Sequence, residues 1–139
     1  MTNTTRFYSR QVAQSLKTPH NIISIGEAGD GCQLNSCHTN VLRLLFQDIQ
    51  EFIEEKYILF SSDHAYLILN WLLSIPKDSL VIVHCEAGIA RSAAVVKFMI
   101  DKLGYELDTD HFCEGDYSLM NTYVYNKLVE QYQLTNKLN

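Results

Sequence analysis

Short apolar runs alternate along the chain with longer segments whose apolar residues recur at helical spacing. Four runs have the length and composition of strands, and residues 80–83 have the composition of a buried one. These predicted strands cover residues 6–9, 21–26, 41–46 and 80–83. Residues 27–40 are rich in Gly, Asp, Asn and Ser, which predicts a loop.

Helices are predicted between and after these strands. A short helix over 10–16 has Ser9 as its N-cap, and another begins at Ser61 or Ser62 and ends at Pro76. From Ile89 the apolar positions follow helical spacing to Gly104, which favours a central, buried helix. A last helix is expected to begin near Asn121, with its apolar side formed by Val124, Leu128 and Tyr132.

Strands alternating with helices indicate an α/β fold with three layers, in which helices flank a mainly parallel central sheet. The 139 residues suit one domain over 1–139, and we find no repeat or linker. The composition is that of a globular protein, with 47% hydrophobic and 19% charged residues.

Charge and hydropathy narrow the classes of partner. The net charge of −5 argues against general binding to nucleic acid or to anionic membranes, both of which need a basic surface. No apolar run approaches the roughly 20 residues of a membrane span, and the first residues lack the apolar core of a secretory peptide. We therefore expect a cytoplasmic protein with no membrane partner.

One segment, residues 81–92, stands out for its chemistry: Val-Ile-Val-His-Cys-Glu-Ala-Gly-Ile-Ala-Arg-Ser. A buried strand runs into a tight loop and then into a helix, so backbone N–H groups converge on one anion site. Gly88 lets the loop curl, and the Arg91 guanidinium can hold two oxygens of a phosphate. The same positive field favours thiolate over thiol at Cys85, which is what a nucleophilic cysteine needs.

This segment resembles the signature of the cysteine-dependent protein tyrosine and dual-specificity phosphatases. The resemblance lies in His84-Cys85, five intervening residues that include Gly88, and Arg91-Ser92. Residues 21–26, 42–49 and 121–128 are also similar to small prokaryotic or phage-type members of that family. The resemblance implies that a phosphorylated protein or peptide is hydrolysed through a phosphocysteine.

The resemblance also implies a role for each residue of the loop. Cys85 attacks phosphorus, Arg91 binds the phosphate and stabilises the transition state, and Ser92 stabilises the thiolate. His84 orders the loop through hydrogen bonds. The phosphate rests on the amides of Glu86, Ala87, Gly88, Ile89, Ala90 and Arg91. Because the loop lacks the Gly-Lys-Ser/Thr ending of nucleotide-binding loops, we expect no metal and no cofactor.

Protonation of the leaving group requires a carboxylic acid that faces the cysteine. Upstream of the loop, the candidates are Asp30, Asp48, Glu51, Glu54, Glu55 and Asp63. Asp48 is favoured because it follows the predicted strand 41–46, and parallel sheets place their sites at the carboxyl ends of strands. The similar small phosphatases also carry Phe-x-Asp-Ile here. Asp63 is better explained as a first-turn helix residue.

The substrate is less constrained than the reaction. The short chain is closer to dual-specificity enzymes than to large tyrosine-specific ones, and Glu86 disfavours polyanions, so we expect phosphotyrosine or dual-specificity protein substrates. Alternatives are a phosphatase of phosphoinositides or RNA 5′ phosphates, a rhodanese-like sulfurtransferase, and a phosphopeptide-binding pseudophosphatase. Family members often carry Pro-Asn before the last helix, whereas this chain has Met120-Asn121; Asn121 can cap the helix, brace the phosphate loop, or do both.

The other cysteines allow one more hypothesis. A zinc ion could in principle be gathered by Cys32, Cys37, His38, His111 and Cys113. The spacing of these residues does not match that of paired zinc ligands, however, and four cysteines in a chain of this length do not indicate a disulfide framework. Unpaired loop thiols are the preferred interpretation.

Overall fold

A computed structural model of the protein describes residues 2–138. Five strands and four helices follow one another in the order β1 (Thr4–Ser9), α1 (Arg10–Ser15), β2 (Asn21–Gly26), β3 (Asn40–Leu45), α2 (Ser62–Leu73), β4 (Leu80–Cys85), α3 (Arg91–Leu103), β5 (Glu106–Leu107) and α4 (Thr122–Leu138). Within the described residues, no helix combines the length and hydropathy needed to cross a membrane.

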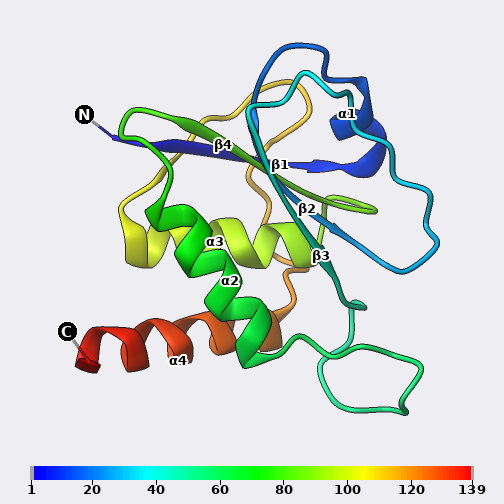
Figure 1. The fold of residues 1–139 in the computed structure, drawn as a ribbon, viewed down its shortest axis with the longest axis vertical. Coiled ribbons are helices and arrows are strands. Elements are labelled where there is room, and N and C mark those ends of the chain that lie inside the picture. The colour runs from blue at the N-terminus through cyan, green and yellow to red at the C-terminus, as the bar shows by residue number, and fades with distance from the viewer. Residues whose placement is uncertain (1, 139) are drawn as a thin grey trace.

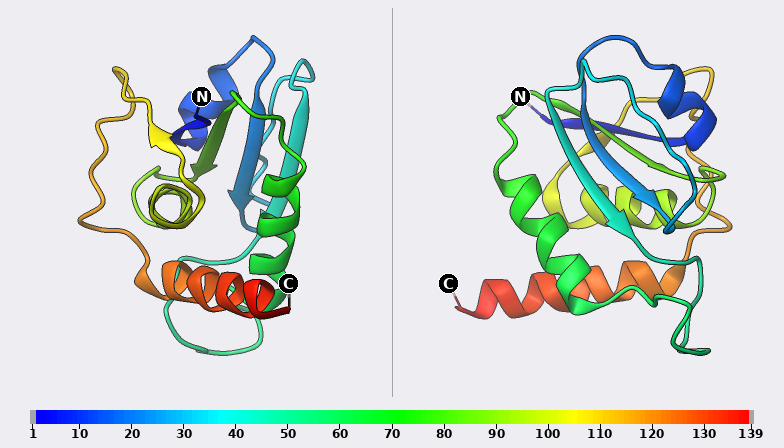
Figure 2. Two further views of the ribbon diagram at one scale, coloured as in Figure 1. Left: turned by 90° about the vertical axis from the view of Figure 1, so that its left-hand side faces the viewer. Right: turned by 45° about the vertical axis from the view of Figure 1, so that its right-hand side comes forward.

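All five strands run parallel in one sheet, in the order β3-β2-β4-β1-β5. Crossovers between parallel strands are right-handed, so α2 and α3, whose connections run in one direction, share a face of the sheet. Helix α1 connects in the other direction and lies apart from them (Figure 1). Helix α4 packs against both α2 and α3 (Figure 2). The three-layer α/β fold expected from the sequence is therefore confirmed.

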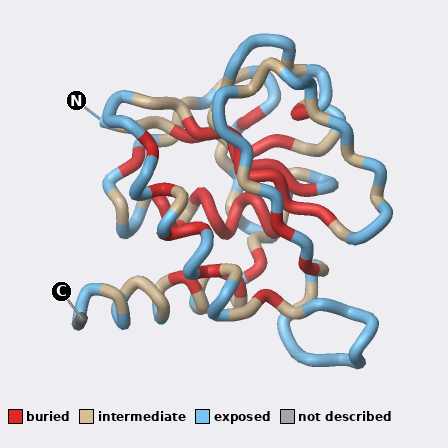
Figure 3. The backbone as a smooth tube through the Cα atoms, in the orientation of Figure 1, coloured by how far each residue is buried: buried red, intermediate tan, exposed pale blue. Residues whose placement is uncertain are grey.

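The core lies around the two central strands and α3 (Figure 3). The side chains of β2 and β4 are buried on both faces, as parallel sheets require, and α3 is buried along most of its length. Val124 and Leu128 of α4 are fully buried, and the Tyr132 ring meets Phe98 of α3 edge-on at 5.9 Å. The prediction of a central, buried α3 is thus confirmed, and so is the apolar side predicted for α4.

Some boundaries differ from the sequence prediction. Strand β4 continues to Cys85, and α3 begins at Arg91 and not at Ile89. Ile89 consequently belongs to the loop and is 45% exposed, because the tight turn at Gly88 delays the start of the helix. The two-residue strand β5 was not predicted, since a pair of residues carries no periodic signal.

The register brings three strand ends to one level. His84 of β4 pairs with Tyr8 of β1 and Ser24 of β2, so the carboxyl ends of these strands lie side by side next to the start of α3. The long connection after β3, exposed at residues 51–58, leaves from the same edge of the sheet. Parallel sheets place their ligand sites at this edge.

Candidate active site

Cys85 is the last residue of β4 and only 2% exposed. Its Sγ lies 3.1 Å from Oγ of Ser92, in the first turn of α3, and accepts a hydrogen bond from the Gly88 N–H at 3.3 Å. Both groups can donate a hydrogen bond to the sulfur.

The loop from Glu86 to Ala90 curls around this sulfur because Gly88 has φ +70° and lies against β1. A Cβ at Gly88 would lie 2.5 Å from the backbone N of Ser9, so no other residue fits without a shift. The carbonyls of Glu86 and Ala90 are bonded outward, to the N–H groups of Arg10 and Asn121. Helix α3 has no side-chain cap at Ala90. Its first N–H groups thus remain available to an anion.

Arg91 begins α3 and is 5% exposed. Its Nη1 donates to the carbonyl oxygen of Phe46 at 2.7 Å, which anchors the guanidinium under the loop that follows β3. Among the described residues, no carboxylate lies within ion-pair distance of its guanidinium. Such an arginine is suited to an incoming anion.

Cys85 and Arg91 open into a cavity of about 640 Å³, and Asp48 lies in its wall. Tyr57, Ile49 and Leu119 supply apolar walls. The remaining lining residues are Glu27, Gln47, Glu86, Ala87, Ile89 and Ala90. The structure therefore brings together at one cavity the predicted nucleophile, the arginine, the favoured acid and the loop of residues 86–90, the predicted phosphate loop.

The structure separates Asp48 from the other candidate acids, because it alone among them lines the cavity. The carboxylate of Asp30 accepts hydrogen bonds from the backbone N–H groups of Glu27 and Cys32. The bond from Cys32 is the main reason that the pKa of Asp30 is lowered. The other four lie in exposed positions: Glu51, Glu54, Glu55 and Asp63. Asp63 lies in the first turn of α2, where the helix dipole stabilises a negative charge, as expected from the sequence.

Asn121 is 2% exposed and lies between the phosphate loop, the loop after β3 and α4. Its backbone N–H donates to Ala90 O at 3.0 Å, and its Oδ1 accepts from the Val124 N–H at 3.1 Å. Its Nδ2 donates to Asp48 Oδ1 at 2.8 Å and to Ile49 O at 3.1 Å. Both roles considered from the sequence, helix cap and loop brace, are present despite the missing proline.

His84 points to the opposite face of the sheet from Cys85, as neighbouring strand residues do. Its Nε2 lies 2.6 Å from Ser24 Oγ, and its Nδ1 lies 3.3 Å from the carbonyl oxygen of Cys85. Burial lowers the pKa of His84, which favours the neutral ring. His84 thus supports the end of β4 from behind and does not touch the cavity.

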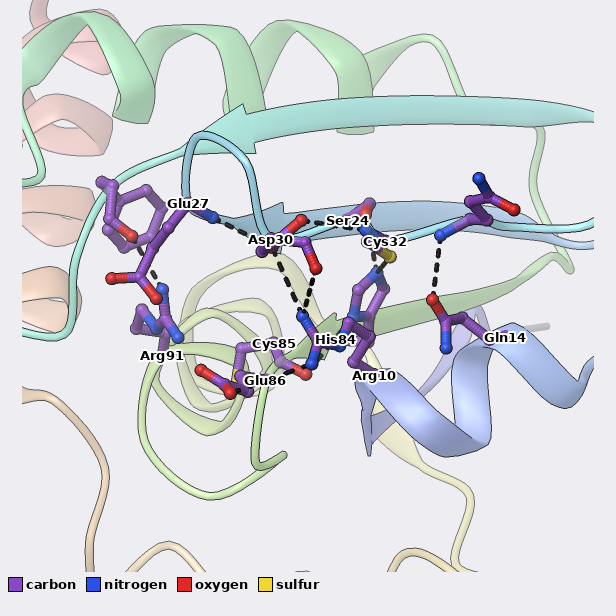
Figure 4. A network of polar contacts seen from close by, with 12 residues as sticks. Arg10, Gln14, Ser24, Glu27, Asp30, Cys32, His84, Cys85, Glu86 and Arg91 are labelled. Atoms are coloured by element: carbon purple, nitrogen blue, oxygen red, sulfur yellow. Dashed lines mark hydrogen bonds and ion pairs between the residues drawn. The ribbon is translucent and has the colours of Figure 1, made fainter.

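A second polar network holds the loop from that side (Figure 4). Arg10 lies 3.9 Å from the Glu86 carboxylate and 4.0 Å from the Asp30 carboxylate, and its Nη1 donates to the Asp30 carbonyl at 2.9 Å. The negative charge of Glu86 is therefore partly offset by Arg10. The network joins the start of α1, the loop after β2 and the phosphate loop.

Sequence reasoning missed several residues of the cavity. Glu27 follows β2, and in Figure 4 its side chain extends toward Arg91. Its position at the carboxyl end of a central parallel strand could have identified it, by the same rule that selected Asp48. Tyr57 and Leu119 come from irregular segments, where no periodic signal predicts which side chains reach a cavity.

The residues considered for zinc are not gathered into one site. Cys32 lies 3.8 Å from His84, Cys37 lies 3.9 Å from its neighbour His38, and Cys113 is buried elsewhere. Within residues 2–138 no group of three or more His, Cys, Asp or Glu side chains could hold a metal ion. All four cysteines are free thiols.

Comparisons of the chain with protein-family models, with curated proteins and with solved structures found no match. The case for a function therefore depends on the geometry of this cavity.

Proposed function

We propose that the protein is a cysteine-dependent phosphoric monoester hydrolase acting on phosphotyrosine, and also on phosphoserine or phosphothreonine, in proteins. The observation that carries the proposal is the placement of Cys85, Arg91 and Asp48 in one cavity, with the first turn of α3 open to it. A nucleophile, an anion-binding group and a proton donor are the three groups that such a hydrolysis needs.

In the first step the Cys85 thiolate attacks phosphorus, an S–P bond forms and the bond from phosphorus to the leaving oxygen breaks. Arg91 and the loop N–H groups stabilise the charge on the phosphoryl oxygens, while protonated Asp48 gives its proton to the leaving oxygen. In the second step water attacks the phosphocysteine and passes a proton to the Asp48 carboxylate. Phosphate leaves, and the thiolate is stabilised by Ser92 and Gly88.

The cavity wall favours a singly phosphorylated aromatic substrate over polyanions. Tyr57, Ile49 and Leu119 offer apolar contact to a phenyl ring. Glu27 and Glu86 add negative charge near Arg91, so a second phosphate, as in a phosphoinositide, would face carboxylates. A cytoplasmic location remains part of this proposal.

The presence of Asp48 in the cavity wall argues against the rhodanese-like alternative. Sulfur transfer from thiosulfate releases sulfite, which needs no proton donor, whereas Asp48 is held beside the cavity by a buried asparagine. A protein that only binds phosphopeptides would need no nucleophile. Cys85 lines the cavity, which favours a catalytic role over binding alone.

The test is a pair of assays on the same preparation: hydrolysis of a small aryl phosphate, and transfer of sulfur from thiosulfate to cyanide. We expect hydrolysis without added metal, no sulfur transfer, and loss of hydrolysis in Cys85→Ser with vanadate binding retained. Cys113→Ser is the matched control and should keep its activity. Sulfur transfer without hydrolysis, or hydrolysis that survives Cys85→Ser, would refute the proposal.

A further inference from the structure

Asn121 uses every hydrogen-bonding group of its side chain. A side-chain amide has two N–H donors and an acceptor oxygen. The donors reach Asp48 Oδ1 and Ile49 O, and the oxygen caps α4 at the Val124 N–H. Helix capping by itself does not require asparagine, because serine and aspartate cap about as well. The two hydrogen bonds that Nδ2 donates, to Asp48 and to Ile49, require the amide.

Asp48 has few other constraints on its position. It lies in the irregular connection between β3 and α2, whose residues 51–58 are exposed. Hydrogen bonds between Gln47 and Ile58 join the two ends of this segment. Its start is also bonded to the beginning of α4, by Asn121 and by Thr122, whose Oγ1 donates to Gln50 Oε1 at 2.8 Å. No other described side chain forms a hydrogen bond or ion pair with the Asp48 carboxylate.

The same residue is bonded to the phosphate loop. The Asn121 backbone N–H donates to the carbonyl of Ala90, the residue directly before Arg91. The carboxylate of Asp48 and the loop that would hold the phosphate are thus attached to one buried residue. A displacement of Asn121 would therefore move Asp48 relative to this loop, and catalysis is sensitive to displacements of about 1 Å.

We propose that Asn121 is a positioning residue: its amide holds the Asp48 carboxyl over the leaving oxygen and fixes it relative to the phosphate loop. The inference rests on the proposed phosphatase function and deepens it. Asn121 does not touch substrate, so its contribution must act through Asp48. It should therefore matter only where the leaving group needs a proton.

The experiment compares Asn121→Ser with wild type on aryl phosphates of graded leaving-group acidity. The variant keeps an oxygen for the helix cap but loses the side-chain amide that donates to Asp48 and Ile49. We expect kcat/KM to fall about 10- to 100-fold for phenyl phosphate. For dinitrophenyl phosphate, which needs no proton, it should stay within about 3-fold of wild type. Asn126→Ser, an exposed position on α4, is the matched control and should match wild type on both.

A double-mutant cycle completes the test. If Asn121 acts through Asp48, adding Asn121→Ser to Asp48→Asn should cause almost no further loss. An equal loss on all leaving groups, or full additivity with Asp48→Asn, would overturn the inference and leave the phosphatase proposal standing. Absence of aryl phosphate hydrolysis in the wild-type protein would instead overturn the proposed function, and the inference with it.

Discussion

Arg91 is fixed by a main-chain carbonyl and not by a carboxylate, so it keeps its charge for a ligand. One N–H binds Phe46 O, and the guanidinium still lines the cavity with the rest of its donors. Lysine would keep the charge, but a single ammonium cannot bond Phe46 O and also hold two phosphoryl oxygens in a plane.

We therefore expect Arg91→Lys to fail nearly as badly as Arg91→Ala, with kcat/KM for an aryl phosphate reduced by about 10²–10³. Steady-state kinetics, with inhibition by inorganic phosphate measured alongside, checks this. Turnover near wild type in the lysine variant would show that charge alone suffices and that the planar arrangement has no role.

Asp48 and Asp63 offer a direct comparison between two carboxylates close in sequence. Asp48 lies in the cavity wall, whereas Asp63 is exposed in the first turn of α2. Asp48→Asn should lower kcat for phenyl phosphate by about 10²–10⁴ and flatten the alkaline limb of its pH profile. Asp63→Asn should do neither. The assignment is wrong if the alkaline limb survives in the first variant and disappears in the second.

The phosphate loop packs closely against the backbone of β1 at Gly88. Gly88 and Gly104 both have positive φ, +70° and +75°, so alanine is strained at either position. A Cβ at Gly104 meets nothing within 4 Å, whereas at Gly88 it would collide with the backbone of Tyr8 and Ser9. The two glycines therefore separate backbone strain from close packing.

Gly104→Ala should cost about 1 kcal/mol of unfolding free energy, the usual strain of a left-handed residue. Gly88→Ala should cost more, about 2 kcal/mol or above, and should also abolish turnover, because the loop must leave β1. Urea unfolding and aryl phosphate assays on both variants check this. Equal stability and retained turnover in the two would contradict the packing argument.

Most of the elements could be predicted because their signals are local. The apolar runs of β2 and β4 and the Ser9 cap of α1 all act within a few residues. The end of α2 was predicted less closely, because Pro76 lies three residues beyond its last residue, Leu73. The phosphate loop was predictable because its residues are consecutive. Glu27, Tyr57 and the bond from Asn121 to Asp48 join segments far apart in the chain, and no periodicity encodes such contacts.

At the scale of the whole molecule, one buried histidine and two partly buried histidines couple folding to pH. Burial is the main cause that lowers the pKa of His84, His64 and His38. Below the ordinary value of about 6.5 the unfolded chain therefore binds more protons than the folded one. The stability that these groups contribute is complete above that pH and is lost as the pH falls through their lower folded values.

We expect the free energy of unfolding to decrease as the pH is lowered from 7 to 5, with His84 contributing at most about 1.4 kcal/mol per pH unit. Urea titrations at several pH values measure this slope, and His84→Gln should make it shallower. A stability that rises on acidification, or a slope unchanged in the variant, would contradict the burial of a neutral imidazole at the end of β4.

The central claim is that Cys85 becomes phosphorylated during turnover. Asp48→Asn with dinitrophenyl phosphate tests it most directly, because transfer to sulfur then needs no acid while hydrolysis of the phosphocysteine lacks its base. The variant is mixed with substrate labelled in the phosphoryl group, quenched and digested, and the peptides are analysed. We expect label on the peptide that contains Cys85. Continued release of dinitrophenol with no label on that peptide, or with label on another residue, would contradict it.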